Sequence, residues 1–190
     1  MSDMWIDVRI PYEPNGKLCT ACNRIMETTQ APWVLILDHD VYLCNPFWYQ
    51  ICLHTVSKIG YKAGWITCVT NNIANGKQLA PGVNRKTDDL IYHINFGAEI
   101  WKKNGLSVKR VSGNLSGLFI LTHKQAWLDA GGFKSRGGNE MCVDTNYAKD
   151  LQEAGYKLYV MTGLYVYHYW KVRKKMLKDL YTLKPFKEEG

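Results

Sequence analysis

The chain has 190 residues, 46% of them hydrophobic, and a formal net charge of +7. This length and composition suit one compact α/β domain and leave little room for a second core. The longest apolar runs are far shorter than the roughly 20 residues of a membrane helix, and the N-terminal residues lack the basic, apolar and small-residue order of a signal peptide. We therefore expect a soluble, cytoplasmic protein.

Short apolar strands alternate with amphipathic helices in the first half of the chain. The periodicity predicts these elements in chain order over residues 5–10 (strand), 17–29 (helix), 33–37 (strand), 46–58 (helix) and 65–69 (strand). A strand, a helix and a second strand in succession favour a parallel pair. Polar residues with Asn, Gly and Pro then predict a loop over residues 70–86, which is long enough to be functional or mobile.

The second half of the chain continues this alternation. Its elements are expected over residues 88–105 (helix), 117–123 (strand), 124–129 (helix), 143–155 (helix), 157–161 (strand) and 164–170 (strand). The helix over residues 88–105 starts with two acids and finishes with Lys-Lys-Asn-Gly, which fits the helix dipole and a glycine stop. We expect the last segment, residues 171–190, to form a basic C-terminal helix or tail, because it holds seven Lys or Arg against three acids.

Two carboxylates follow the predicted strand over residues 33–37, in the sequence LILDHDV. Parallel α/β sheets bind ligands beyond the carboxyl ends of their strands, and Asp38 and Asp40 are expected there. Acids at positions i and i+2 can both turn toward one ion, and their oxygens suit Mg²⁺ or Mn²⁺, which would in turn neutralise a diphosphate. The alternative is that Asp40 caps the following turn and that Asp38 is simply exposed.

Four blocks in a fixed order carry a resemblance to known proteins. They are IPYEPNGKLCTACNRIME, LILDHDV, SGLFILTHKQAWLDAGGF and VDTNYAKDLQEAGYKLYVMTGLYVYHYW. In these blocks the chain resembles family 2-like glycosyltransferases of the GT-A fold, from residue 10 to residue 170. The resemblance implies a single GT-A catalytic domain over residues 1–170, in which helices flank a central, mostly parallel mixed sheet, followed by the basic tail over residues 171–190.

The resemblance also implies a metal-dependent glycosyltransferase of the hexosyltransferase type. Such an enzyme would move a sugar from a nucleoside-diphosphate sugar, expected to be UDP-linked, to a hydroxyl of a glycan or glycoconjugate with inversion. Asp38 and Asp40 become the D-x-D acids, with Asp40 as the direct ligand of Mn²⁺ or Mg²⁺ and Asp38 nearer the ribose or the metal. His168 matches a late strand histidine that completes the metal site, although a histidine flanked by aromatic residues is often a core residue.

Asp144 matches the second acid of the family's Glu-Asp pair, but this chain has Val143 where Glu is usual. In an inverting transfer, a carboxylate takes the proton of the acceptor hydroxyl as this hydroxyl attacks the sugar. Asp144 is expected to be that catalytic base, and the alternative role is a helix N-cap. Glu140, in the preceding loop, is the substitute base if Asp144 points elsewhere.

Four residues near the N-terminus correspond to the nucleotide end of the site: Pro11, Tyr12, Asn23 and Arg24. Tyr12 would border the base and Arg24 would meet phosphate, whereas the alternatives are a strand end for Pro11 and a helix surface for Arg24. The family usually has more chain between its first strand and its D-x-D acids, so this half of the site is abbreviated. Gly117 is expected to let the backbone approach the donor, or to relieve packing at a strand start.

Other functions stay open at this stage. A nucleotidyltransferase also needs acids and Mg²⁺, although no Gly-rich phosphate loop follows the first strand. Val143 keeps a non-catalytic sugar-nucleotide binding module open. A nucleic-acid-binding module would use the basic tail, but no such signature is present and no nucleic-acid partner is expected, whereas the tail could contact a membrane surface peripherally. Cys19 and Cys22 form the C-x-x-C motif, for which reduced structural thiols are favoured over a zinc or redox site.

Overall fold

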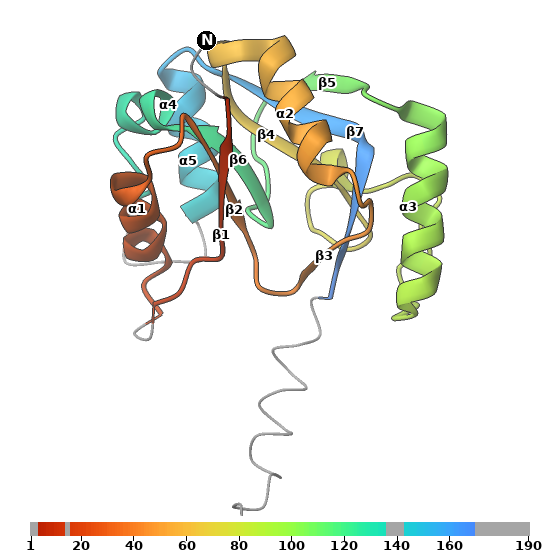
Figure 1. The fold of residues 1–190 in the computed structure, drawn as a ribbon. Coiled ribbons are helices and arrows are strands. Elements are labelled where there is room, and N and C mark those ends of the chain that lie inside the picture. The colour runs from red at the N-terminus through yellow and green to blue at the C-terminus, as the bar shows by residue number, and fades with distance from the viewer. Residues whose placement is uncertain (1–3, 14–15, 136–142, 170–190) are drawn as a thin grey trace, which may run out of the picture.

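The computed structural model describes residues 4–13, 16–135 and 143–169. In this part of the chain a seven-stranded mixed sheet lies between helices (Figure 1). Its strands are β1 (Ile6–Arg9), β2 (Trp33–Leu37), β3 (Val41–Leu43), β4 (Ala63–Thr70), β5 (Val108–Val111), β6 (Phe119–His123) and β7 (Lys157–His168). The helices are α1 (Leu18–Thr28), α2 (Trp48–Ile59), α3 (Leu90–Asn104), α4 (Lys124–Asp129) and α5 (Val143–Glu153), with 3₁₀ turns η1 (Gly60–Lys62) and η2 (Gly76–Gln78). None of these helices is long and apolar enough to cross a membrane.

The helices agree with the hydrophobic periodicity to within a few residues. In α1 the buried side chains include Cys19, Cys22 and Met26, whose spacing places them on one face of the helix. Both cysteines carry buried thiols, which agrees with the structural role favoured for the motif. α3 starts after Asp89, whose side chain accepts a hydrogen bond from the backbone of Ile91, and ends at Gly105 with a φ of 51°. The predicted acidic start and glycine stop of this helix are therefore confirmed.

The sheet is less parallel than the resemblance implies. Its strand order is β1-β2-β6-β4-β7-β3, with β5 also paired to β7. β1 and β2 are parallel, as the strand-helix-strand order predicts. The expectation of a mostly parallel sheet is wrong for the described residues, because β1–β2 and β4–β7 are parallel whereas β2–β6, β4–β6, β3–β7 and β5–β7 are antiparallel. Periodicity locates strands but carries no information about their direction.

β7 is one strand of twelve residues where the sequence analysis predicts two. Its register with β4 shifts between Cys68 and Val69, so that the pairing is irregular near the middle of β7. A Cβ on Gly163 would lie 1.8 Å from the carbonyl oxygen of Gly105, so glycine is required where β7 passes the end of α3. The sequence analysis does not predict β3 or β5, which are short and only partly buried.

β2 is buried along its whole length because helices cover both faces of the sheet (Figure 1). Val34 and Ile36 belong to the core cluster that includes side chains of α1, α4 and α5. Trp33 and Leu35 belong to the second cluster, which includes side chains of α2. Successive side chains of a strand point to opposite faces, so this alternation explains the uninterrupted apolar sequence. The polar residues that follow Leu37 mark the point where the chain leaves the interior.

Candidate metal centre and adjoining cleft

Asp38 and Asp40 lie in the turn between β2 and β3, at the carboxyl end of β2. The backbone of this turn is fixed on two sides. The N–H of Asp38 donates to the carbonyl of Leu118 at 3.1 Å, and the N–H of Tyr169 donates to the carbonyl of Asp40 at 2.8 Å. The turn is therefore tied to the residue that precedes β6 and to the residue that follows β7, and both carboxylates have a defined place at the sheet edge.

His168, the last residue of β7, lies beside these acids because it pairs with Val41 in the β3–β7 register. Its Nε2 is 3.4 Å from Oδ1 of Asp40. Its Nδ1 is 2.9 Å from the carbonyl oxygen of Asn72, and its backbone N–H donates to the side chain of Asn71 at 2.8 Å. An accepting carbonyl at Nδ1 fixes the proton on that nitrogen, so the neutral ring presents the Nε2 lone pair toward the acids.

The charges of this group stabilise one another. Burial raises the pKa of Asp40, but the hydrogen bond with His168 and the positive charges of His168 and His39 outweigh burial and leave this pKa below its usual value. Burial lowers the pKa of His168, but its hydrogen bonds to Asp40 and to the Asn72 carbonyl, together with the charges of Asp40 and Asp38, leave it above the usual value. The site therefore favours a positive charge between the carboxylates, supplied by a proton on His168 or by a cation.

The three side chains together provide a suitable donor set for a divalent cation. One ligand atom each from Asp38, Asp40 and His168 lie within 4.8 Å of one another. Two ligands that are each about 2.1 Å from one ion are at most about 4.2 Å apart, so a small side-chain rotation suffices to bring all three onto one cation. Two carboxylates and one imidazole suit Mn²⁺, and the carboxylates suit Mg²⁺.

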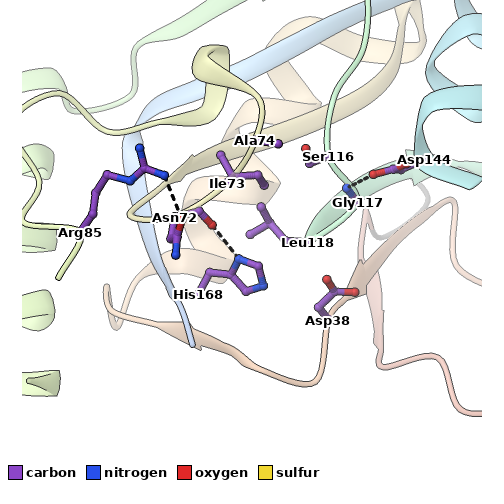
Figure 2. Close-up of a pocket in the computed structure, with 10 residues that line it drawn as sticks. All are labelled: Asp38, Asn72, Ile73, Ala74, Arg85, Ser116, Gly117, Leu118, Asp144 and His168. Atoms are coloured by element: carbon purple, nitrogen blue, oxygen red, sulfur yellow. Dashed lines mark hydrogen bonds between the residues drawn. The ribbon is translucent and has the colours of Figure 1, made fainter. Parts of the chain in front are cut away.

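A cleft of about 420 Å³ opens beside this group (Figure 2). Its walls come from the ends of several strands, from the loop after β4 and from the first turn of α5. The lining residues are Asp38, Asn72, Ile73, Ala74, Arg85, Ser116, Gly117, Leu118, Asp144 and His168. Polar and charged side chains from distant parts of the sequence therefore meet at one edge of the sheet, which is the arrangement expected of a ligand site in an α/β protein.

Asp144 is held against the cleft by backbone donors. Its Oδ2 accepts from the N–H of Gly117 at 3.0 Å, and its Oδ1 accepts from the N–H of Thr145 at 2.7 Å. A Cβ on Gly117 would lie 3.1 Å from the Cβ of Asp144, so the glycine makes room for the start of α5. Val143 is 2% exposed and belongs to the core, which leaves no solvent-facing position for a second acid there. Glu140 lies outside the described residues, as does the basic tail over residues 171–190.

The predicted nucleotide end is only partly assembled at the site. Pro11 lines a second hollow of about 200 Å³, and Asp38 lines both this hollow and the cleft. Tyr12 is 76% exposed, and its carbonyl accepts a hydrogen bond from Arg24 at 2.8 Å. Arg24 also lies 3.7 Å from the carboxylate of Glu13, which lines the second hollow. Tyr12 and Arg24 thus lie close to the second hollow without lining it.

Asn23 is not brought to the site. Its side-chain oxygen accepts from Trp127 Nε1 at 2.9 Å and from the N–H of Phe133 at 2.8 Å, and its side-chain nitrogen donates to the carbonyl of Phe133 at 3.0 Å. These bonds tie α1 to the turn after α4. Asn23 lines neither the cleft nor the second hollow, and its amide bonds to Trp127 and Phe133, so its assignment to the nucleotide end stays a prediction without support from this arrangement.

The sequence analysis does not identify Arg85, Asn72 or Ser116, which line the cleft. Arg85 Nη2 donates to Asn72 Oδ1 at 3.0 Å, so the loop after β4 is cross-linked within itself at the cleft wall (Figure 2). The length of this loop is the signal that points to these residues, and it identifies the segment without the particular side chains.

No protein-family model matches the chain, and no curated protein matches it either. The site is therefore interpreted from its own chemistry. It combines a three-residue donor set for a divalent cation, a cleft beside this set, and a further carboxylate held by backbone N–H groups on the cleft wall.

Proposed function

We propose that the chain is a metal-dependent glycosyltransferase that moves a sugar from a nucleoside diphosphate to a hydroxyl of a glycan or glycoconjugate. One observation carries this proposal. The ligand atoms of Asp38, Asp40 and His168 lie within 4.8 Å of one another, and the cleft beside them also contains the carboxylate of Asp144. A donor set for a cation and a separate carboxylate within the same cleft meet the two chemical requirements of a metal-dependent transfer.

In this proposal Asp38, Asp40 and His168 hold Mn²⁺ or Mg²⁺, with Mn²⁺ preferred because imidazole is a poorer ligand for Mg²⁺. When bound, the cation neutralises the charge of the donor diphosphate. Asp38 contacts both hollows, so it positions the donor between the cleft and the hollow lined by Pro11. A UDP-linked donor remains the expected one.

Asp144 acts as the base in the proposed inverting reaction. The acceptor oxygen forms its bond to the anomeric carbon while the bond from this carbon to the diphosphate breaks, and the diphosphate leaves with the bonding electron pair. The proton of the acceptor hydroxyl passes to Asp144. The hydrogen bonds from Gly117 and Thr145 orient the carboxylate for this transfer.

Arg85 provides positive charge on the same cleft wall. A guanidinium group is a suitable partner for the oxygens of a phosphate or a carboxylate. Its hydrogen bond to Asn72, whose carbonyl also contacts His168, connects this arginine to the cation ligands. Arg85 therefore binds an anionic part of the donor or the acceptor in this proposal.

Calorimetric titration with a panel of nucleotide sugars, in Mn²⁺ and in excess chelator, tests the proposal. Uridine nucleotides should bind best, and binding should fall sharply in chelator and in Asp40→Asn. The exposed Glu99→Gln on α3 is the matched control and should bind as the wild type does. Equal donor affinity in chelator and in Mn²⁺ would contradict the proposal.

Product analysis separates the enzyme classes. Free nucleoside diphosphate marks sugar transfer, whereas pyrophosphate marks a nucleotidyltransferase. Burial of Val143 in the core favours one further candidate, a protein that binds sugar nucleotides without turnover, because the first acid of the Glu-Asp pair is replaced here by a buried apolar side chain. Metal-dependent donor binding with neither product, tested with a series of glycan and glycoconjugate acceptors, would support that candidate against the transferase.

A further inference from the structure

A further hollow, distinct from the cleft and from the hollow lined by Pro11, lies at the opposite end of the sheet from the candidate metal centre. Its volume is about 480 Å³, and we term it the amino-edge hollow because its lining includes the residues just before β4 and the first residues of β7. Three basic and three tyrosine side chains dominate its lining: Lys62, Arg110, Lys157, Tyr61, Tyr156 and Tyr159. β7 begins here at Lys157 and ends at His168, and these eleven residue steps span roughly 35 Å. The amino-edge hollow is therefore separate from the candidate active site.

The cations of the amino-edge hollow carry excess positive charge. Within the described residues, neither Lys62 nor Arg110 nor Lys157 has a carboxylate at ion-pair distance. The nearby acid Asp129 is engaged by other groups, because its carboxylate accepts from Tyr156 at 2.6 Å and from Gln125 at 2.7 Å. Three clustered cations without such partners favour an anionic ligand.

The tyrosine walls are held in place by a buried aromatic group. Tyr61 stacks on Trp33 with ring centroids 5.9 Å apart and meets His123 edge-on at 4.9 Å. Tyr156 also meets His123, at 5.6 Å. Tyr159 pairs directly with Arg110 across the β5–β7 ladder. The walls are thus set before any ligand binds, which reduces the entropy lost on binding.

The buried aromatic group behind these walls contains two further ring nitrogens, Trp33 Nε1 and His123 Nε2. Trp33 Nε1 and His123 Nε2 are the buried side-chain atoms without a hydrogen-bond partner in the described part of the chain. His123 Nδ1 accepts from the N–H of Ala126, so the ring proton is on Nε2 and both unpaired atoms are donors. The rings of Trp33 and His123 both contact Tyr61, so they help to hold this wall of the hollow.

We propose that the amino-edge hollow binds an acidic saccharide, that is, a sugar ring carrying a phosphate, sulfate or carboxylate group. The cations match the acidic group, and flat tyrosine rings with hydroxyl groups match the faces and hydroxyls of a sugar. A volume of about 480 Å³ is in the range of pockets that bind small molecules. A single-stranded nucleic acid also combines negative charge with rings, but such binding uses a groove that follows several nucleotides, whereas this hollow has a volume of about 480 Å³. The inference does not depend on the proposed transferase activity.

Binding to the full-length chain is measured by calorimetry in excess chelator, where the proposed transferase reaction cannot contribute. The ligands are a sulfated dextran oligosaccharide, the unsulfated oligosaccharide of equal length, and a single-stranded oligonucleotide of equal charge. The triple variant Lys62→Gln/Arg110→Gln/Lys157→Gln tests the cations. Lys58→Gln/Lys86→Gln/Lys102→Gln removes the same charge from exposed positions outside the hollow and is the matched control.

The wild type should bind the sulfated oligosaccharide more tightly than either other ligand. The hollow variant should lose at least about tenfold in affinity, because charge-assisted hydrogen bonds are lost, and the control should lose no more than about twofold. Tyr159→Leu should weaken saccharide binding while melting within a few degrees of the wild type. Equal losses in the two triple variants, tighter oligonucleotide binding, or no binding of the sulfated oligosaccharide would overturn the proposal.

Discussion

The two ends of β7 carry opposite charge. At its carboxyl end His168 lies beside Asp40, within the group that also contains Asp38. At its amino end Lys157 lines the amino-edge hollow together with Lys62 and Arg110. One strand therefore contributes to an acidic group and to a basic hollow, and the two share no lining residue.

The two ends also differ in how their charged groups are held. The acids belong to a short turn whose backbone is bonded to Leu118 and Tyr169, so their positions are fixed by the main chain. The cations are the tips of long side chains that retain rotamer freedom. Fixed carboxylates suit a small cation that requires defined ligand distances, whereas adjustable cations suit an anionic ligand with spread charge. The comparison indicates that one end is suited to metal chemistry and the other to binding.

Removal of the base tests the chemistry at the carboxyl end. Asp144→Asn keeps the shape of the side chain but cannot take a proton, so turnover should fall by about 10²- to 10⁴-fold. Donor affinity in Mn²⁺ should stay within about twofold, because Asp144 is not among the cation ligands. Initial rates of nucleoside diphosphate release and calorimetry measure the two quantities.

Glu153→Gln, an exposed change on the same helix, is the control for Asp144→Asn and should leave turnover unchanged. A variant at Asp144 that turns over normally would remove this residue from the mechanism. A variant that loses donor binding as completely as turnover would assign it a binding role instead.

Removal of one cation ligand tests the distinction between the two ends directly. Asp40→Asn should weaken Mn²⁺ binding at least about 100-fold, since loss of even an outer partner of a metal ligand costs up to about this factor. The triple variant of the amino-edge hollow should bind Mn²⁺ within about twofold of the wild type. Calorimetric titration with Mn²⁺ measures the affinity of both variants. A similar loss of Mn²⁺ affinity in both would show that the two ends are coupled.

The strand that joins the two ends depends on a glycine. Gly163→Ala should lower the free energy of unfolding by about 2 to 3 kcal/mol, because the new methyl group would clash with the carbonyl of Gly105. Gly76→Ala is the matched control, since a Cβ there meets no atom within 4 Å. Urea unfolding measures both. Equal stability of the two variants would show that β7 passes α3 differently from this structure.

Histidine titration gives the smallest of these effects, and the net pKa shift differs in sign between regions. Burial lowers the pKa of His93 and of His123, although nearby carbonyls and acids raise it in part. At these two histidines the folded state binds fewer protons than the unfolded chain. Their contribution to stability is therefore complete above about pH 6.5 and declines as the pH falls through the lowered pKa values. The pKa of His168 is raised, so its contribution is complete below about pH 6.5 and is lost as the pH rises through its folded pKa.

Urea unfolding at pH 7.5 and pH 5 tests this sign. His93→Gln should show a smaller loss of stability on acidification than the wild type, whatever its stability at pH 7.5. His54→Gln, at an exposed position on α2, should keep the loss of the wild type. An equal loss in His93→Gln would mean that the buried ring is not responsible for acid sensitivity.

The residues that the sequence analysis locates well are those whose role follows from local pattern. A fully apolar strand that ends on two acids predicts that Asp38 and Asp40 lie at a sheet edge, and both lie in the turn after β2, where Asp38 lines the cleft and Asp40 is buried beside His168. The ends of α3 also follow from local pattern, because the acids before Leu90 predict its start and Gly105 predicts its stop. The partner of these acids, His168, is 128 residues away from Asp40, and its place beside them was suggested by resemblance and depends on the β3–β7 pairing.

The features that the sequence analysis misses depend on contacts between distant segments. Asn23 has the residue type of a ligand-binding side chain, but Trp127 and Phe133 bond to it. The antiparallel direction of β6 is set by its two neighbours in the sheet. The amino-edge hollow joins residues from η1, β5 and β7 and from the turn before β7, and no local pattern brings Lys62 and Arg110 together.

Pulsed electron paramagnetic resonance of the Mn²⁺-loaded protein tests the central claim most directly. The account predicts one tightly bound Mn²⁺ with a nitrogen modulation from the imidazole of His168. This modulation should disappear in His168→Gln, and bound Mn²⁺ should be largely lost in Asp40→Asn. A protein that binds no Mn²⁺, or a nitrogen modulation that persists in His168→Gln, would contradict the account.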